Sequence, residues 1–531
     1  MTTQNPKDQP QEKNLANKVI ELIINDCELV HDQQKAPFAI VNKGGARQVF
    51  SIGSKNFSDW VASRYYESKK SALSDASLKT VLGTLSGKAV YDGKPVAIYT
   101  RIAKTEDSYW LDLCNERWEA VLINKEGWRV ESGGNTPLFC RSNSMMAIPN
   151  PIKGGSLDPL WDLVNIPPEY RLIVIAWLLE CLREDTPHVV MEFVGEQGSA
   201  KSTTQKLLKM LIDPNIANLR AAPKKVEDVW IGAINSHLVS FENISFLGQD
   251  YQDALCVLAT GGAHATRTLY TNREEVIIEL KKPIILNGIT VNVTAQDLID
   301  RALHIELPPI TKRLQSSNVE VVFSQQYANI VGALLDQFVT ALSVINSVVI
   351  DDEDKPRMVD FAYLGEAVFQ ANHHASGDFI KRYQKMRKKA VHRTIESSPI
   401  GWALFTYLQS NPNGWNGKLI DLLAQLGALR PAGETNWPRS AKGLGDALRR
   451  LTPALRTLGF KCTANQKTSG SILWDINPMP SKVPNQCPTS TGSPETSSGS
   501  DPDHGNLGHS VHLGHESKTS EGGGYAEPIP V

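Results

Sequence analysis

The sequence has no cysteine pairs of the kind that bind zinc or build a disulfide framework. Its seven cysteines are scattered and no C-x-x-C occurs, which favours reduced thiols in a cytoplasmic protein. An apolar signal core is missing from its start, and its most apolar run, Leu172 to Leu182, is too short to span a bilayer. We therefore expect no membrane segment.

A strong charge of either sign is missing as well. The 531 residues carry a net charge of −2, so any surface that binds nucleic acid has to be local. The length allows about three domains of roughly 150 residues each. The two ends, 1–16 and 478–531, are polar and poor in large apolar residues, which predicts a disordered arm and a disordered tail.

Residues 17–150 alternate strand-like and helical patterns, which is typical of an α+β domain. Trp110, Trp118 and Trp128 fall in its strand-rich part; they could stack on bases, but core packing is the commoner role of large aromatics. Asp112 is the only acid of the run YWLDL, and no D-x-D pair occurs in this region. Because a primase needs paired carboxylates to hold two metals, we expect no primer synthesis here.

The rest of the chain is organised around residues 189–204, which predict a strand, a glycine-bearing loop and a helix. The loop fits the pattern G-x-x-x-x-G-K-[ST], except that Ala200 stands where the second glycine belongs. Loop N–H groups and the helix N-terminus form an anion site, Lys201 can reach the β- and γ-phosphates, and the Ser202 hydroxyl can ligate Mg²⁺. The residues expected to bind ATP and Mg²⁺ are Gly195, Gly198, Ser199, Ala200, Lys201, Ser202 and Thr203.

Hydrolysis needs an acid linked to the metal, a group that polarises water, and a cation for the transition state. The run SHLVSF predicts a buried strand that ends at Glu242, where parallel strands carry functional groups; a capping or loop acid is the alternative. The run KPIILNG ends in Asn287, which either bonds the water or γ-phosphate or forms a turn before glycine. Arg301 either reaches a neighbour's γ-phosphate or pairs with Asp297 or Asp300.

Between these two runs, a helical segment, Gly261-Gly262 and two β-rich stretches predict a hairpin inserted into the core. The basic residues that the hairpin would present to DNA include His264, Arg267 and Arg273.

In their order these motifs resemble the superfamily 3 helicases of the AAA+ class, with Walker A, Walker B, a hairpin region called B′, a sensor asparagine and an arginine finger. The segment T-G-G-x-x-x-x-R-x-L-Y resembles the B′ region of poxvirus and phage primase–helicases. E-N-I-S and I-L-N-G-I are similar to motifs of phage and integrative-element ATPases. The motifs cover residues 188–310.

The resemblance implies an α/β P-loop core that binds Mg²⁺ through Ser202 and Glu242, senses nucleotide through Asn287 and uses Arg301 as the finger. It also implies Arg267 in the DNA-tracking hairpin, and a homo-oligomeric ring, since the finger has to reach a neighbour's nucleotide. The chain departs from the pattern at two places. The first is Ala200, where a side chain is tolerated if φ stays negative. The second is Glu242-Asn243, which stands where the family usually has two acids. Its single carboxylate cannot easily serve as both metal partner and base.

The segment Lys381 to Arg393 has seven Lys or Arg in thirteen residues. This strip, with Arg387, Lys388 and Lys389, either contacts DNA phosphates or forms a solvated helix face. After it, three helical patterns and two β-like runs predict a winged helix, in which Arg449 and Arg450 would face DNA; a winged helix that binds protein is the alternative.

We thus expect an α/β chain with a P-loop, AAA+-like core, an N-terminal α+β domain and a C-terminal winged helix. The expected function is an ATP-dependent helicase or translocase of a phage or mobile element, acting on single-stranded or forked DNA. The alternatives are a DNA-binding replication initiator or loader with structural or regulatory ATP, and a small-molecule phosphotransferase, against which the hairpin and winged helix argue. The expected divisions are 1–16, 17–150, 151–395, 396–477 and 478–531.

Overall fold

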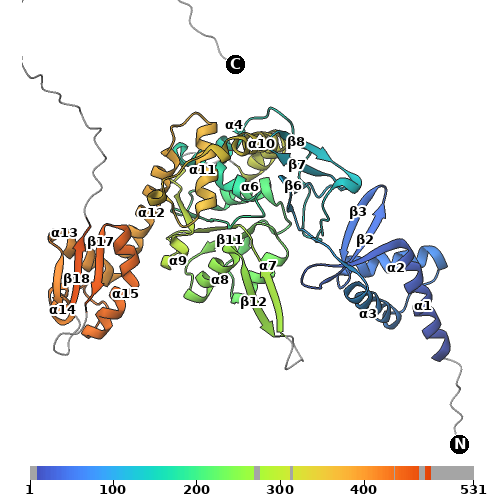
Figure 1. Ribbon diagram of the computed structural model, residues 1–531, viewed down its shortest axis with the longest axis horizontal. Coiled ribbons are helices and arrows are strands. Elements are labelled where there is room, and N and C mark those ends of the chain that lie inside the picture. The colour runs from blue at the N-terminus through green and yellow to red at the C-terminus, as the bar shows by residue number, and fades with distance from the viewer. Residues whose placement is uncertain (1–8, 268–274, 311–314, 436, 466–472, 480–531) are drawn as a thin grey trace, which may run out of the picture. The chain divides into compact units, whose positions relative to one another are not determined.

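The computed structural model describes residues 9–267, 275–310, 315–435, 437–465 and 473–479 (Figure 1). Within them the chain has the mixed α/β character that the sequence predicted. Arg273 and nearly all of the predicted tail lie outside the described residues.

The first unit packs three helices on a four-stranded sheet whose order is β3-β2-β1-β4. The predicted arm is wrong for residues 9–16, because they belong to the first helix, where Leu15 and Ala16 contact the core of this unit. Its elements are α1 (Gln9–Asp26), β1 (Cys27–His31), β2 (Pro37–Lys43), β3 (Ala46–Ser51), α2 (Lys55–Lys69), α3 (Asp75–Tyr91) and β4 (Lys94–Pro95).

A second, antiparallel sheet follows in the order β5-β6-β7-β8. Its strands are β5 (Ile102–Thr105), β6 (Ser108–Asp112), β7 (Ala120–Asn124) and β8 (Gly127–Glu131). The buried face of this sheet packs on the central region. The Tyr109 ring lies 5.3 Å from the Phe338 ring, and Trp128 Nε1 donates to Asp336 Oδ1 at 2.7 Å. The expected boundary at residue 150 is therefore wrong in terms of packing.

The tryptophans and the acid in and around this sheet have structural contacts. Trp110 and Trp128 are buried, which confirms core packing. The Arg141 guanidinium lies over the Trp118 ring, with its Cζ 3.8 Å from the ring centroid. Asp112 is buried and its Oδ1 lies 2.6 Å from Arg141 Nη2, so its carboxylate is engaged in an ion pair rather than free for a metal.

The central sheet is parallel throughout, in the order β10-β11-β14-β9-β15. Its strands are β9 (Val190–Val194), β10 (Arg220–Ala221), β11 (Val239–Ile244), β14 (Ile284–Gly288) and β15 (Ala302–Glu306). The helices of this region are α4 (Asp158–Leu163), α5 (Arg171–Glu180), α6 (Lys201–Ile212), α7 (Val226–Ile234), α8 (Gln249–Thr260) and α9 (Gln296–Ile299). An antiparallel hairpin, β12 (Gly262–Arg267) and β13 (Glu275–Leu280), is inserted after α8, as predicted.

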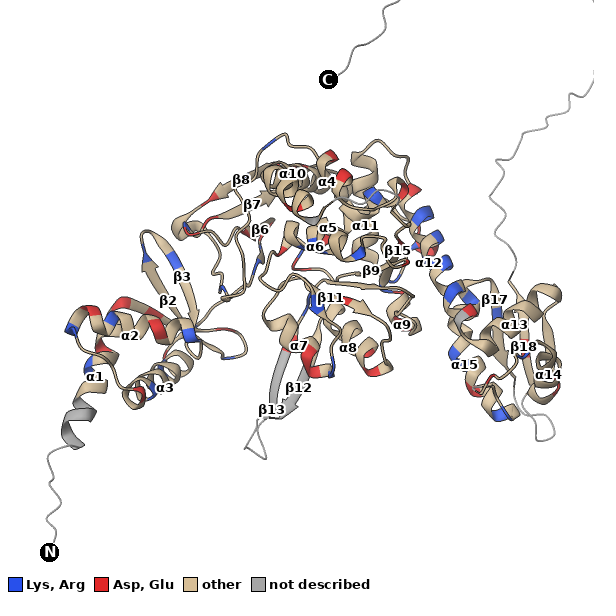
Figure 2. Cartoon of the chain, turned by 180° about the vertical axis from the view of Figure 1, so that it is seen from behind, with Lys and Arg blue, Asp and Glu red and all other residues tan. Residues whose placement is uncertain are grey.

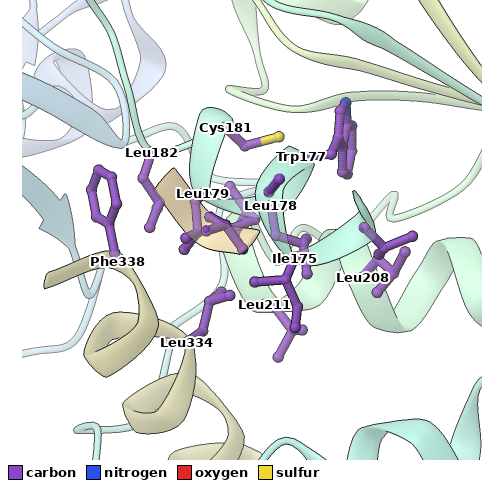
Figure 3. Close-up of a cluster of buried hydrophobic side chains, with 14 of the residues drawn as sticks. Ile175, Trp177, Leu178, Leu179, Cys181, Leu182, Leu208, Leu211, Leu334 and Phe338 are labelled. Atoms are coloured by element: carbon purple, nitrogen blue, oxygen red, sulfur yellow. The ribbon is translucent and has the colours of Figure 1, made fainter. Parts of the chain in front are cut away.

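Alternation along the strands divides the core into two layers. Met191, Phe193 and Ile285 belong to a cluster with α5 and α6, whereas Val190 and Ile284 belong to a cluster with α7, α8 and α9. Figure 3 shows the first cluster, where α5 side chains lie between those of α6 and Phe338. Strands of a sheet that is covered by helices on both faces have continuous apolar sequences, which is why β9 and β14 could be predicted.

Three helices follow the sheet: α10 (Ser316–Val344), α11 (Val359–Ala371) and α12 (Asp378–Ser397). By length and composition alone α10 could cross a membrane. Its Phe323, Ile330, Leu334 and Phe338 are buried in the core, which is the ordinary reason for such a helix in a folded domain.

The C-terminal unit has three helices and a three-stranded antiparallel sheet in the order β16-β18-β17. The predicted helices and terminal hairpin are present. Its elements are α13 (Pro399–Ser410), β16 (Trp415–Lys418), α14 (Leu419–Leu426), α15 (Ala441–Thr457), β17 (Phe460–Ala464) and β18 (Leu473–Pro478). The chain also has short 3₁₀ turns at Gly133–Asn135, Pro168–Tyr170, Ile345–Ser347, Asp352–Asp354 and Gly427–Leu429.

Candidate functional site

The loop 195–200 joins β9 to α6 and takes left-handed backbone at two positions. Gly198 has a φ of 88°, which glycine adopts freely, and Ala200 has a φ of 57° and a ψ of 26°. The condition under which a side chain is tolerated at this position, a negative φ, is therefore not met. An L-residue in this conformation costs about 1–2 kcal/mol, so the loop bends as a glycine would allow and Ala200 carries the strain.

Lys201 begins α6 and turns its ammonium back over the loop. Its Nζ donates to the carbonyl oxygens of Gly195 and Glu196, both at 2.8 Å. Burial lowers the pKa of the ammonium. The cation thus lies inside the curve of the loop, where a phosphate oxygen can replace a carbonyl partner.

The serines and threonine around Lys201 have different surroundings. Ser199 is fully buried, and its Oγ donates to Glu196 O at 3.0 Å, so it closes the loop. Ser202 and Thr203 are partly exposed in the first turn of α6 and line a cavity of about 350 Å³. The walls of this cavity come from the end of α4, from α6, from Ile310 and from α10, and they combine apolar side chains with the charged Asp162, Lys206 and Glu320.

Glu242 and Asn243 occupy a β-bulge within β11. Two residues of β11 lie opposite Asn287 alone, since the flanking pairs are Phe241 with Leu286 and Ile244 with Gly288. Asn243 takes a φ of 53°. Within the described residues, the Glu242 carboxylate has no hydrogen bond or ion pair. Bulges redirect a side chain out of the ladder and are common beside active sites.

Asn287 is fully buried at the end of β14, and its side chain contacts protein groups. Its Nδ2 donates to Gln205 Oε1 at 2.6 Å, and its Oδ1 accepts from the Asn243 N–H at 2.9 Å. The motifs did not point to Gln205. The signal was a polar residue on the apolar face of a helix, in register with Leu208 and Ile212, which are both fully buried.

Arg301 lies at the amino end of the strands, whereas the loop lies at their carboxyl end. The strand that follows it starts with Ala302, which pairs with Val190 at the start of β9, so a strand length of about 16 Å separates Arg301 from the loop. Within one chain its guanidinium forms an ion pair with Asp297, the alternative that the sequence left open, and its Nη1 also donates to Asp297 O at 2.8 Å.

The basic residues of α12 are partly engaged. Arg387 Nη2 lies 2.5 Å from Asp300 Oδ1, before β15, and Lys389 Nζ lies 3.2 Å from Glu306 Oε2, at its end. Lys388 is exposed and has no ion pair among the described residues. Figure 2 shows the row of Lys and Arg along α12; part of it holds the helix on β15.

The other predicted DNA contacts lie on two elements. The backbone of β12 includes His264 and Arg267. In the helix α15, Arg450 is exposed, while Arg449 Nη1 lies 2.7 Å from Asp446 Oδ1. No group of three metal-ligating side chains occurs in the described part of the chain.

Two family models match this chain. The replication proteins of actinomycete integrative conjugative elements match residues 157–381, and the C-terminal domain of the RepA proteins of these elements matches residues 400–490. The chain resembles these replication proteins. The first match includes the loop, the bulge, the hairpin and Arg301. The predicted resemblance to the replication proteins of mobile elements is confirmed.

No curated protein matches the chain. Among solved structures, the C-terminal region of NrS-1 is 14% identical, with 87% of this chain and 98% of that chain covered and a TM-score of 0.37. The structure titled "SCCmec type IV Cch - active helicase" is 10% identical, with 85% and 92% covered and a TM-score of 0.42.

Proposed function

We propose that the chain is an ATP-dependent DNA helicase or translocase that acts in the replication of an integrative element. One observation carries the proposal: the Lys201 loop and the unpartnered Glu242 carboxylate lie at the same edge of the parallel sheet. The carboxyl edge of such a sheet is where ligands bind. The match to replication proteins supports the reaction class.

In this site the loop N–H groups and Lys201 would hold the triphosphate. The Ser202 hydroxyl and the Glu242 carboxylate fit Mg²⁺, which binds one or two carboxylates and completes its shell with phosphate oxygens and water. Magnesium, when bound, neutralises charge that develops on the phosphates. Glu242 is also the acid available at the bulge to orient the attacking water.

The cavity beside α6 suits the base of the nucleotide. It opens next to Ser202 and Thr203, and its walls include Leu207 and Ile310. Asn165 shapes its rim, because its Nδ2 donates to Ser199 O at 3.0 Å and to Pro308 O at 2.6 Å. A purine packed against the apolar part of these walls, with its phosphates on the loop, has the expected form of a nucleotide complex.

Arg301 would complete the site of a neighbouring subunit. It is too far from its own loop to contact the nucleotide, and its ion pair with Asp297 would have to exchange for a phosphate. An arginine that acts in trans is a known way to stabilise transferred phosphoryl groups. A closed ring of identical subunits satisfies this geometry at every site.

DNA would be contacted by the β12–β13 hairpin and by the C-terminal unit, which has the elements of a winged helix. Lys388 and Arg450 are better candidates for phosphate contacts than Arg387 and Lys389, which are held in ion pairs. Contacts of this kind are blind to sequence and weaken with salt.

The test is the ATPase rate of the wild type and of Lys201→Ala, with and without single-stranded DNA. We expect DNA-stimulated hydrolysis that Lys201→Ala abolishes. Lys79→Ala, an exposed lysine of α3, should leave the rate unchanged. ATP binding without turnover would contradict a motor and favour the initiator or loader, a reading that the strained Ala200 and the single carboxylate also support.

A further inference from the structure

Gln205 is buried between α6 and the sheet and contacts both functional strands. Its Nε2 lies 2.8 Å from Ser240 Oγ and 3.0 Å from Phe241 O, both in β11, and 3.3 Å from Ile285 O in β14. Its Oε1 accepts from Asn287 Nδ2 at 2.6 Å. A single side chain thus links the helix of Lys201 and Ser202 to two strands of the sheet, β11 and β14.

The chain of contacts continues to the acid. Asn287 Oδ1 accepts from the backbone N–H of Asn243, the left-handed residue directly after Glu242. On its other side the bulge is held by Asn292, whose Nδ2 donates to Ile244 O at 3.0 Å. The direction in which Glu242 leaves the strand is therefore set by two amides, and one of them is oriented by Gln205.

We propose that Gln205 is a positioning residue, which couples the phosphate-binding helix to the Glu242 bulge through Asn287. This inference rests on the proposed nucleotide site and gives Asn287 a different role from the one first expected. Asn287 holds the bulge that carries Glu242. Gln205 fixes the position of that bulge relative to α6, so that the Ser202 hydroxyl and the Glu242 carboxylate face the same ion.

Gln252 provides a matched control. It is also a buried glutamine in a helix of the same core; its Nε2 donates to Leu247 O at 2.9 Å and its Oε1 accepts from Thr294 N at 2.8 Å. Its hydrogen bonds go to Leu247, Thr294 and Ala295, and none goes to Glu242 or Asn287. Replacing either glutamine with methionine keeps the volume and removes the hydrogen bonds, so a general loss of stability should be shared by both variants.

The experiment compares Gln205→Met and Gln252→Met in two measurements. The first is the rise in thermal midpoint produced by ATP in EDTA and the further rise produced by ATP with Mg²⁺. The second is kcat and KM for hydrolysis. We expect Gln205→Met to keep the rise in EDTA, to lose the Mg²⁺ increment, and to lower kcat about 100-fold with little change in KM, as a small misplacement of a reacting group does. Gln252→Met should keep the increment and kcat.

A double variant, Gln205→Met with Asn287→Leu, should lose no more kcat than Gln205→Met alone, because residues that act as one unit are not additive. The inference is overturned if Gln205→Met behaves as Gln252→Met does, or if it loses ATP binding in EDTA as well. A wild type that shows the Mg²⁺ increment but no turnover contradicts the proposed hydrolysis alone, and the increment then decides on Gln205. A wild type that ATP does not stabilise overturns both.

Discussion

Arg101 and Asp213 form an ion pair that solvent does not reach. Arg101 Nε lies 3.1 Å from Asp213 Oδ1, and both side chains have zero exposure. Arg101 directly precedes β5, and Asp213 follows α6 at the C-cap, so the pair ties the second sheet to the helix that begins with Lys201. The other oxygen of Asp213 lies 3.1 Å from Lys209 Nζ, and the two buried cations share one anion.

Asp213→Asn should therefore be strongly destabilising. It removes the carboxylate that the buried Arg101 and Lys209 share, and loss of one partner of such a group lowers the free energy of unfolding by about 3–5 kcal/mol. Urea unfolding measures this. Asp92→Asn removes a solvent-exposed partner of Lys88 and should change the same free energy by less than about 1 kcal/mol; equal effects would show that the buried pair has no special weight.

A fragment that begins at residue 151 should not fold to a stable core. Ile102, Leu111 and Val121 belong to the same buried cluster as α5 and α10, and their removal would expose that surface. A fragment of residues 97–480 keeps them and should unfold cooperatively in urea. Cooperative unfolding of 151–480 at a similar midpoint would contradict the shared core.

Ala200→Gly should stabilise the protein by about 1 kcal/mol. Glycine removes the cost of a side chain at a φ of 57°, and this gain exceeds the extra entropy that glycine gives the unfolded chain. Ala76→Gly, in the first turn of α3, serves as the control and should have the opposite sign. The check is the urea midpoint of each variant; a less stable Ala200→Gly would show that the loop is not strained.

Stability should fall in mild acid because of two buried histidines. The rings of His188 and His237 lie 6.3 Å apart; burial lowers the pKa of His237 to about 3 and lowers the pKa of His188 as well. Protons therefore bind the unfolded chain first, at its ordinary pKa of about 6.5, and stability is complete above that pH and is lost as pH falls toward 3. The loss reaches about 1.4 kcal/mol per pH unit for each group.

Urea unfolding between pH 7.5 and 4.5 measures this slope. In His237→Gln the new amide can replace the contact of His237 Nε2 with Cys181 O. The free energy of unfolding of this variant should fall less steeply as the pH decreases. His392→Gln, at a half-exposed site, should leave the slope unchanged. An identical slope in all three proteins would contradict the assignment.

An equal mixture of Lys201→Ala and Arg301→Ala should recover part of the ATPase activity that each variant lacks alone. In the mixture, a Lys201→Ala subunit still offers its arginine to an intact loop in an Arg301→Ala neighbour. Recovery that depends on protein concentration would identify a site made by two subunits. Full activity of Arg301→Ala alone would show that its ion pair with Asp297 is its whole role.

Local patterns in the chain were enough to predict the strands and the helix on which the candidate site lies. A buried strand ending in glycine, a lysine and serine at the start of a helix, and polar residues at the ends of two further apolar runs are properties of consecutive residues. They led to Lys201, Glu242 and Asn287, because the carboxyl ends of parallel strands meet at one side of a sheet. The hairpin was predicted from two β-rich stretches that follow a Gly-Gly pair.

Tertiary structure decided the relationships between these elements. The bulge at Glu242, the left-handed Ala200, the hydrogen bonds of Gln205 and the packing of β5–β8 on α10 each depend on residues far apart in the chain, which come together only when the sheet and its helices are assembled. A pattern of neighbours shows which face of a helix or strand is apolar. It does not show which polar groups of other elements that face will contact. The hydrogen bonds of Gln205 and the ion pair of Arg101 depend on those contacts.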